Sequence, residues 1–362
     1  ANETLDLGGG MWSLGDPRLT GCRFLGNLAT AHNFQGMGAA LYSNGNPVIQ
    51  DCLFRDNRAN SSGGAVFSIG SPTVDDCRLE SNFGGAGGAF SAQGNAVFTN
   101  CLFAGNVAVN DIFENSGGAV SCDGSPSFFN CTFTACAAAD KGGGIYVFAG
   151  NTLLTNNIFW GNSDRSGSGE SAQIFLETGT TTQLNFCCVE GLTGVLGGVG
   201  NMNEDPRFAD ELGGDFHLRA VSPCIASGNG LLSGIPKLDF EGDSRFPALG
   251  TDIGFDEFAR HLYVLGDFTP GGAVTIKIVG DPGSSPVVLS VGLGLKEVPD
   301  STPSGNFFLE NLVKEKGLPP VPPSGILVVP ATLPPVPPAS GIFALQALVG
   351  DKLTNPWRID VE

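Results

Sequence analysis

The chain has 362 residues and a formal net charge of −18, with 18 lysines and arginines against 36 aspartates and glutamates. This charge argues against nucleic acid and anionic lipid surfaces as partners, because both require basic patches. We expect no membrane span, since no apolar run reaches the length that crosses a bilayer. Glycine supplies 54 residues and no window shows a long 3.6-residue period, which excludes a helical fold.

One phrase recurs through the first half of the chain: Phe or Leu, two further residues and Asn, followed by a glycine-rich turn. The phrases start at residues 24, 54, 79, 103 and 159, with a degenerate copy at residue 133. A period of 24 to 30 residues that carries short apolar strands and glycine turns predicts a solenoid. A cysteine lies two residues before five of these starts, at Cys22, Cys52, Cys77, Cys101 and Cys131.

Each repeat has the length of one coil of a right-handed parallel β-helix, which needs about three short strands and three turns. Strict alternation in the second copy places Cys52 and Phe54 inside, with Leu53 and Arg55 outside. We therefore expect inner columns of Phe and Cys, and an Asn ladder at a turn, where asparagine tolerates left-handed backbone and bonds neighbouring amides. Paired glycines would permit positive φ and close approach of the next coil. These ladders are interpreted as architecture rather than as a ligand site.

The solenoid is expected to occupy residues 1–258. Its phrases change after residue 190, and we interpret residues 191–258 as an irregular C-terminal capping segment that covers the last coil. Coil-like sequence starts within about twenty residues of Ala1, so no comparable cap is expected at the N-terminal end.

The repeats and the segment that follows them resemble known bacterial proteins. The Phe-x-x-Asn and Gly-Gly-Ala phrases are similar to the repeats of polymorphic outer-membrane proteins and related surface β-helix proteins. The phrases Asp205-Pro206, Gly214 to Leu218, Ser222 to Ile225 and Asp252 to Gly254 resemble the end of secreted right-handed β-helix repeat proteins. The resemblance covers residues 20–258. It implies a β-helix fold and export, while the activity stays open because the family is functionally mixed.

Residues 259–362 are expected to form a second domain. Seven short strand-like stretches separated by Gly and Pro turns predict an antiparallel, immunoglobulin-like β-sandwich. Such modules resemble the sorting or assembly domains of exported β-helix proteins. Two proline-rich stretches flank one apolar strand, which we interpret as a protected edge strand or, alternatively, as a polyproline partner site. That strand is the candidate assembly interface: Ile326, Leu327, Val328 and Val329.

The ten cysteines do not suggest a metal or redox site, because no Cys-x-x-Cys pair occurs and only three histidines are present. Some disulfides are plausible if the protein is exported, with the connectivity left open. We predict no catalytic residues and no cofactor-binding residues. Asp75 and Asp76 form the only adjacent acidic pair in the repeats, and their alignment with Gln50-Asp51 and Thr99-Asn100 indicates a solvent-facing corner.

Calcium is the candidate small ligand. Asp239, Glu241 and Asp243 alternate around Gly242 and could offer oxygen ligands in a tight loop, with Asp252 and Asp256 nearby. The alternative is a solvated acidic turn, which is favoured because the loop lacks a twelve-residue calcium pattern.

These features predict a secreted, extracellular or cell-surface structural protein that is not an enzyme. We expect copies to assemble head to tail into a fibre or surface layer, through the N-terminal end of one copy and the C-terminal domain of the next. The alternative is a β-helix that binds or cleaves a polysaccharide.

Overall fold

A computed structural model describes residues 2–4, 7–30, 36–109, 115–219, 222–243, 245 and 251–257, residues 319–320, and the strands between residues 262 and 360. The chain divides into two compact units, residues 1–257 and residues 258–362, each described below by itself. The fold is all-β, and the described residues contain a single short helix, α1 (Glu170–Gln173). No described helix has the length and apolarity needed to cross a membrane.

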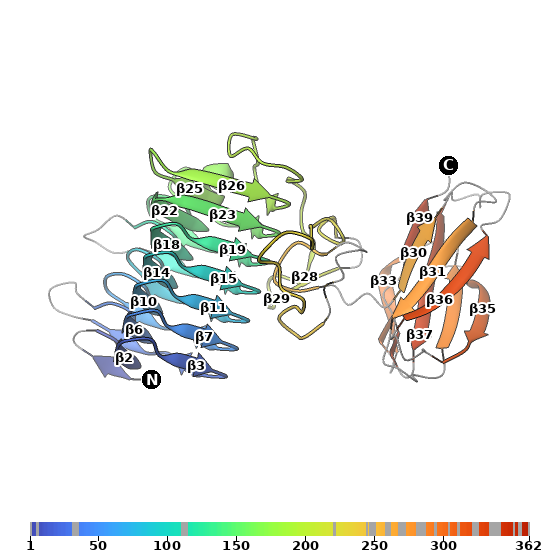
Figure 1. Cartoon of the computed structure of the whole chain (residues 1–362), viewed down its shortest axis with the longest axis horizontal. Helices are drawn as coiled ribbons and strands as arrows, with labels where there is room; N and C mark the ends of the chain where they lie inside the picture. Colours follow the sequence, from blue (N-terminus) through green and yellow to red (C-terminus); the bar gives the residue numbers. More distant parts are fainter. Residues whose placement is uncertain are drawn as a thin grey trace. The chain divides into compact units, whose positions relative to one another are not determined.

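The first unit is a parallel β-helix in which the first six coils supply four strands each, rather than the expected three, and the last coil supplies three (Figure 1). The strands stack into four parallel sheets, which we name after their first members. The β1 sheet contains β1 (Glu3–Thr4), β5 (Leu28–Ala29), β9 (Arg58–Ala59), β13 (Phe83–Gly84), β17 (Val107–Ala108) and β21 (Ala137–Ala138). The β2 sheet contains β2 (Met11–Leu14), β6 (Leu41–Asn44), β10 (Val66–Ile69), β14 (Phe90–Gln93), β18 (Val120–Asp123), β22 (Ile145–Ala149) and β25 (Ile174–Leu176).

The other two sheets lie on either side of the repeat cysteine, and the second of them contains the Phe position. The β3 sheet contains β3 (Arg18–Thr20), β7 (Val48–Gln50), β11 (Thr73–Asp75), β15 (Val97–Thr99), β19 (Ser127–Phe129), β23 (Asn151–Thr155) and β26 (Thr181–Asn185). The β4 sheet contains β4 (Arg23–Leu25), β8 (Leu53–Arg55), β12 (Arg78–Glu80), β16 (Leu102–Ala104), β20 (Thr132–Thr134), β24 (Ile158–Trp160) and β27 (Cys188–Val189). The fourth strand of each coil was missed because the β1 sheet uses strands of only two residues, too short to show an alternation.

The predicted inner ladder of phenylalanines is confirmed. Phe103, Phe133 and Phe159 are fully buried, and their rings stack with centroids 4.7 Å and 4.5 Å apart. Phe54 is equally buried, and Leu79 fills the level between it and Phe103. The cysteine column is also confirmed, with the thiols donating to backbone carbonyls, as from Cys101 Sγ to Thr99 O at 3.1 Å. All ten cysteines are free.

The asparagine ladder is buried at a corner, but its residues do not supply the left-handed backbone. The residue before each asparagine does so, as at Asp56 (φ 58°) and Ser81 (φ 53°). Asn57 instead satisfies neighbouring backbone groups: its Oδ1 accepts from the Asn27 N–H at 3.0 Å, and its Nδ2 donates to Phe24 O at 2.9 Å. The repeated amide is therefore explained by hydrogen bonding between coils, and the φ explanation was wrong for this position.

Paired glycines have two separate roles. Gly63, Gly87 and Gly117 adopt φ values of 63°, 69° and 73°, where a side chain would be strained. The glycine after each of them permits close approach, since a Cβ on Gly64 would lie 1.9 Å from the carbonyl oxygen of Gly88 on the next coil.

Residues after the last coil cover two parts of the solenoid, its end and one of its corners. Leu192 and Leu196 pack against the core, and Met202 bridges to Cys188, so residues 192–202 cover the end of the solenoid. A short antiparallel hairpin follows, made of β28 (Phe208–Asp210) and β29 (Asp215–Leu218). The described residues from 222 to 257 then run back along the corner between the β3 and β4 sheets. We call them the return segment.

Amide side chains of that corner hold the return segment. Asn100 Nδ2 donates to Leu238 O at 2.9 Å, and Asn130 Nδ2 donates to Asp252 O at 3.1 Å. The Asn229 N–H donates to Asn156 Oδ1 at 2.9 Å. The corner that was expected to face solvent is exposed at Asp51 but buried from Asn100 onward. The expectation was wrong for the upper coils because an element remote in sequence covers them.

The second unit consists of antiparallel strands. One sheet has the order β30 (Leu262–Gly266), β31 (Ala273–Val279), β36 (Ile326–Thr332). Another joins β35 (Leu312–Leu318), β32 (Val287–Gly292), β37 (Ile342–Val349) and β38 (Lys352–Leu353), with β39 (Trp357–Asp360) on β37. The pair β33 (Leu295–Thr302) and β34 (Gly305–Leu309) is separate. The strands agree with the predicted antiparallel class, while face-to-face packing as a sandwich stays a prediction.

Candidate functional site

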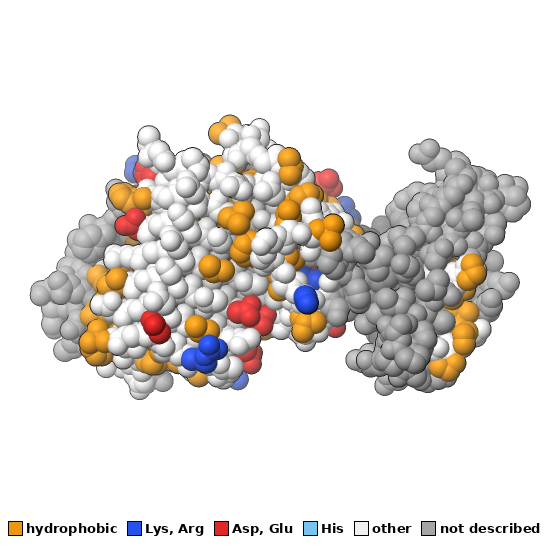
Figure 2. Space-filling model, viewed as in Figure 1, with side chains coloured by type: hydrophobic (Ala, Val, Ile, Leu, Met, Phe, Trp, Pro, Cys, Tyr) orange, Lys and Arg blue, Asp and Glu red, His pale blue; other side chains and the backbone are white. Residues whose placement is uncertain are grey.

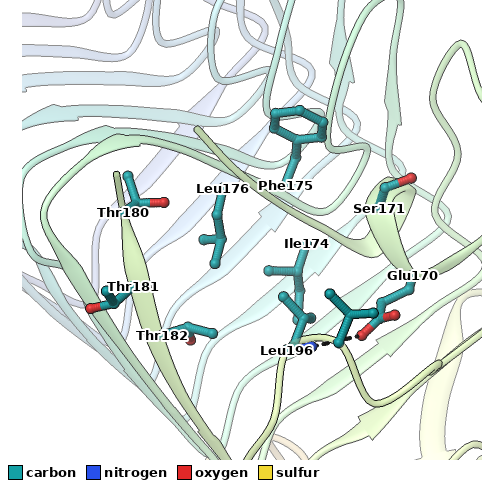
Figure 3. Close-up of a pocket in the computed structure, with 10 residues that line it drawn as sticks. Glu170, Ser171, Ile174, Phe175, Leu176, Thr180, Thr181, Thr182 and Leu196 are labelled. Carbon is teal, nitrogen blue, oxygen red and sulfur yellow. Dashed lines mark hydrogen bonds between the residues drawn. The ribbon is translucent and has the colours of Figure 1, made fainter. Parts of the chain in front are cut away.

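An open pocket lies at the end of the solenoid, beside the last coil (Figure 3). Its volume is about 460 Å³. Its walls are Glu170 and Ser171 of the α1 turn, the threonines 180–182, and an apolar set of Ile174, Phe175, Leu176, Val195 and Leu196. Glu170 is not a free acid here, because its carboxylate accepts from the backbone N–H groups of Thr193 at 3.0 Å and Leu196 at 3.4 Å. This glutamate therefore anchors the covering loop.

A column of aromatic rings follows the outer face of the β2 sheet. The strand register aligns one residue per coil, in the order Trp12, Tyr42, Phe67, Ser91, Ser121, Tyr146 and Phe175. Tyr42 stacks on Phe67 with centroids 5.6 Å apart, and Tyr146 stacks on Phe175 at 6.0 Å. Two serines interrupt the column at its middle.

A smaller pocket of about 200 Å³ lies at this interruption. Phe67 lines it from one side and Tyr146 from the other, with Ser91, Ser121 and Asp123 among the residues between them. Tyr146 is held by a hydrogen bond from its hydroxyl to Glu177 Oε1 at 3.0 Å. The pocket thus combines aromatic walls with hydroxyl groups, a combination that suits a sugar or another polar ring.

A cluster of potential metal ligands lies where hairpin β28–β29 meets the return segment. His217, Glu241 and Asp256 place their ligand atoms within 4.8 Å of one another, the only such set among the described residues. His217 Nδ1 contacts Asp215 Oδ1, and His217 Nε2 lies 3.4 Å from Glu241 Oε1. Asp256 is 5% exposed, and no described residue donates a hydrogen bond to it.

The electrostatics of this cluster are dominated by its carboxylates. Burial, together with the charges of Asp239 and Glu241, raises the pKa of Asp256 to about 8, against the lowering effect of His217 and Arg245. Burial lowers the pKa of the His217 imidazole, but the charges of Asp256, Asp215 and Glu241 outweigh that effect and leave the pKa raised. The cluster therefore places one imidazole among three carboxylates.

The predicted calcium loop is organised differently from the expectation. Asp239 is buried, and its carboxylate accepts from the backbone N–H groups of Asp243 at 2.7 Å, Glu241 at 3.0 Å and Glu257 at 2.8 Å. Asp239 therefore shapes the loop. Of the three predicted ligands, only Glu241 joins a ligand set in the described part of the chain. Asp252 accepts from the Ala226 N–H at 2.6 Å.

The acidic pair of the repeats lies at the edge of the return segment. Burial, together with the charge of Asp76, raises the pKa of Asp75 to about 6. Asp76 Oδ1 accepts from Asn100 Nδ2 at 3.0 Å. The structure thus gives Asp76 a bond to the same asparagine that holds Leu238 O.

The candidate assembly residues Ile326, Leu327, Val328 and Val329 all lie on β36. This strand pairs with β31 alone among the described strands, so it is an edge of its sheet. Their role in assembly stays a prediction.

Sequence reasoning missed the His217 cluster and the aromatic column. His217 is 24 residues from Glu241 and 39 from Asp256, and no repeat links them. The column did have a signal, because an aromatic residue recurs two or three positions after several of the Gly turns, as in Gly10-Met11-Trp12 and Gly64-Ala65-Val66-Phe67.

The comparison with known families agrees with this geometry. Residues 19–189 match the family model of the right handed beta helix region. The match covers the coils from β3 to β27 and supports the right-handed sense predicted for them. This family includes enzymes and non-enzymes, so the right-handed β-helix by itself leaves the activity open. No curated protein matches the chain.

Proposed function

We propose that this protein is a structural component of an extracellular or cell-surface assembly in which copies associate end to end. The observation that carries the proposal is the first coil. Its strands β1, β2, β3 and β4 each pair on one side only among the described residues. Trp12 and Leu14 on β2 are 51% and 68% exposed. Unpaired strand edges beside exposed apolar groups favour pairing with a further strand, which we propose is supplied by another copy.

The edge strand β36 of a second copy is the proposed partner. It spans seven residues and β2 spans four, the longest of the first-coil strands. Adding β36 to the β2 sheet would satisfy backbone groups of both edges. Because the two surfaces differ, the contact is heterologous and can continue as a filament. The extracellular location rests on the resemblance of the repeats to exported proteins.

The test places a charge on the exposed edge of the full chain. Trp12→Lys should abolish concentration-dependent association in sedimentation velocity and remove filaments from negative-stain micrographs, since an edge lysine opposes strand pairing. Leu212→Lys is the matched control, because Leu212 is fully exposed on the hairpin loop, remote from β2. A monomeric native chain at high concentration would contradict the proposal, as would association that Trp12→Lys leaves intact.

A second candidate is binding of a neutral polysaccharide, favoured by the pocket between Phe67 and Tyr146. The net charge of −18 makes polyanionic glycans poor ligands. Ser121→Phe would fill the gap in the aromatic column and should eliminate binding to neutral glycans while the fold is kept. Ala139→Phe, at an exposed position of the same coil, serves as control. Equal binding by both variants would exclude this pocket.

A further inference from the structure

The return segment and hairpin β28–β29 bring three ligand side chains together from separate parts of the chain. His217 comes from β29, Glu241 from the loop after Asp239, and Asp256 from the last described residues of the first unit. We propose that His217, Glu241 and Asp256 bind one divalent transition-metal ion of the Zn²⁺ class, with Asp215 as the residue that orients the imidazole.

The unpartnered carboxylate of Asp256 is the first support. A buried carboxyl group normally makes hydrogen bonds, and it either keeps its proton or faces a cation, because burying an uncompensated charge is costly. Asp256 is 5% exposed and receives no hydrogen bond from the described residues. The nearest buried cation, Arg245, is paired with Glu257 at 2.9 Å. A metal ion would supply the missing partner.

The geometry around the imidazole is the second support. Asp215 contacts Nδ1, which fixes the ring and leaves Nε2 toward Glu241. A carboxylate behind a coordinating histidine is the usual outer partner in such sites. Bonds of about 2.0–2.1 Å at tetrahedral angles separate ligand atoms by roughly 3.3–3.4 Å. The observed separation from Nε2 to Glu241 Oε1 is 3.4 Å, and the ligand atoms of all three residues lie within 4.8 Å of one another.

The donor set selects the class of ion. Calcium prefers six to eight oxygen ligands, whereas imidazole with carboxylates suits zinc and its neighbours. The side chains of His217 and Glu241 are 44% and 53% exposed, which gives the ion an entry path and leaves room for water in the remaining position. An ion bound by all three side chains would hold the return segment against the hairpin.

The experiment titrates the metal-free full chain with Zn²⁺ against a chromophoric chelator. Cys22→Ser is used as background, because Cys22 is the one cysteine of the chain that is not buried. We expect one Zn²⁺ per chain and a rise in the unfolding temperature on binding. Asp215→Asn should weaken binding by roughly 10–100-fold. His217→Gln and Asp256→Asn should weaken it at least as much.

Two controls keep the result interpretable. Glu204→Gln removes an exposed carboxylate outside the cluster and should leave the affinity unchanged. Glu241→Gln, at a half-exposed position, replaces Asp256→Asn if that variant fails to fold. Absence of Zn²⁺ binding by the folded chain would overturn the proposal, as would Zn²⁺ binding indifferent to His217→Gln. Calcium binding that outcompetes Zn²⁺ and tolerates His217→Gln would overturn it in favour of the acidic loop.

Discussion

At the scale of residues, stacking between coils explains why the repeat keeps the same side chains. Phe103 and Phe133 gain parallel ring contact at 4.7 Å in addition to burial. Asn82 passes hydrogen bonds along the column, because its Oδ1 accepts from the Asn57 N–H while its own N–H donates to Asn106 Oδ1. The same residue type makes the same contacts on each coil, so ring packing and hydrogen bonding to the backbone explain the repeat.

Phe103→Ala should lower the free energy of unfolding by about 3–5 kcal/mol, because it removes a buried ring and leaves a cavity between its neighbours. Phe148→Ala is the matched control, since Phe148 is 57% exposed. Urea unfolding followed by circular dichroism gives both values. A loss for Phe103→Ala no greater than that of the control would refute the inner register.

Asp75→Asn should stabilise the protein at pH 7 to 8. The folded pKa of Asp75 is about 6, above its ordinary value of 3.8, because the site is partly buried. Between pH 3.8 and about 6 the folded state therefore binds more protons than the unfolded state, so stability falls as pH rises through this range. The gain from Asn should vanish below pH 3.8, where both states are protonated.

Thermal unfolding of the two chains across this pH range measures the effect. Asp56→Asn, at an exposed turn of the preceding coil, is the control. A stability gain that is independent of pH would show that Asp75 acts through packing rather than charge.

At the scale of elements, the return segment binds along one corner of the solenoid and adds hydrogen bonds between distant parts of the first unit. Arg245 is its main anchor, because Nη1 donates to Glu257 Oε2 at 2.9 Å and Nη2 donates to Asn100 Oδ1 at 3.1 Å and Phe255 O at 2.9 Å. These bonds tie the segment to itself and to a coil more than a hundred residues earlier. The described face of the first unit in Figure 2 shows scattered hydrophobic side chains with acidic and basic groups between them.

Arg245→Met should cost about 3–5 kcal/mol, since it leaves the carboxylate of Glu257 buried without its cation. Lys237→Met removes an exposed cation of the same segment and should change stability little. Denaturant midpoints of the two variants give the comparison. Equal midpoints would show that the ion pair does not hold the return segment.

At the scale of the whole molecule, the chain divides at residue 257 into units with different internal pairing. The first unit stacks parallel strands, each level contacting its neighbours, and the second pairs strands in antiparallel order. Units with their own strand pairing are expected to unfold as separate cooperative blocks.

Calorimetry should accordingly resolve two unfolding transitions. Phe103→Ala should lower the temperature of one and leave the other in place, because Phe103 belongs to the first unit alone. A single transition that shifts as a whole would show instead that the two units unfold together.

The sequence by itself determined the parallel β-helix, its repeat register, the inward Phe and Cys columns and the antiparallel strands of the second unit. Those features recur once per coil or alternate every second residue, so local spacing encodes them. The tertiary structure alone decided that the return segment covers the Asn100 corner and that His217, Glu241 and Asp256 converge. These contacts occur once, between segments far apart in the chain, and no sequence repeat predicts them. Asp239 shows the same limit, because its turn was expected to be solvated, whereas three backbone N–H groups donate to its buried carboxylate.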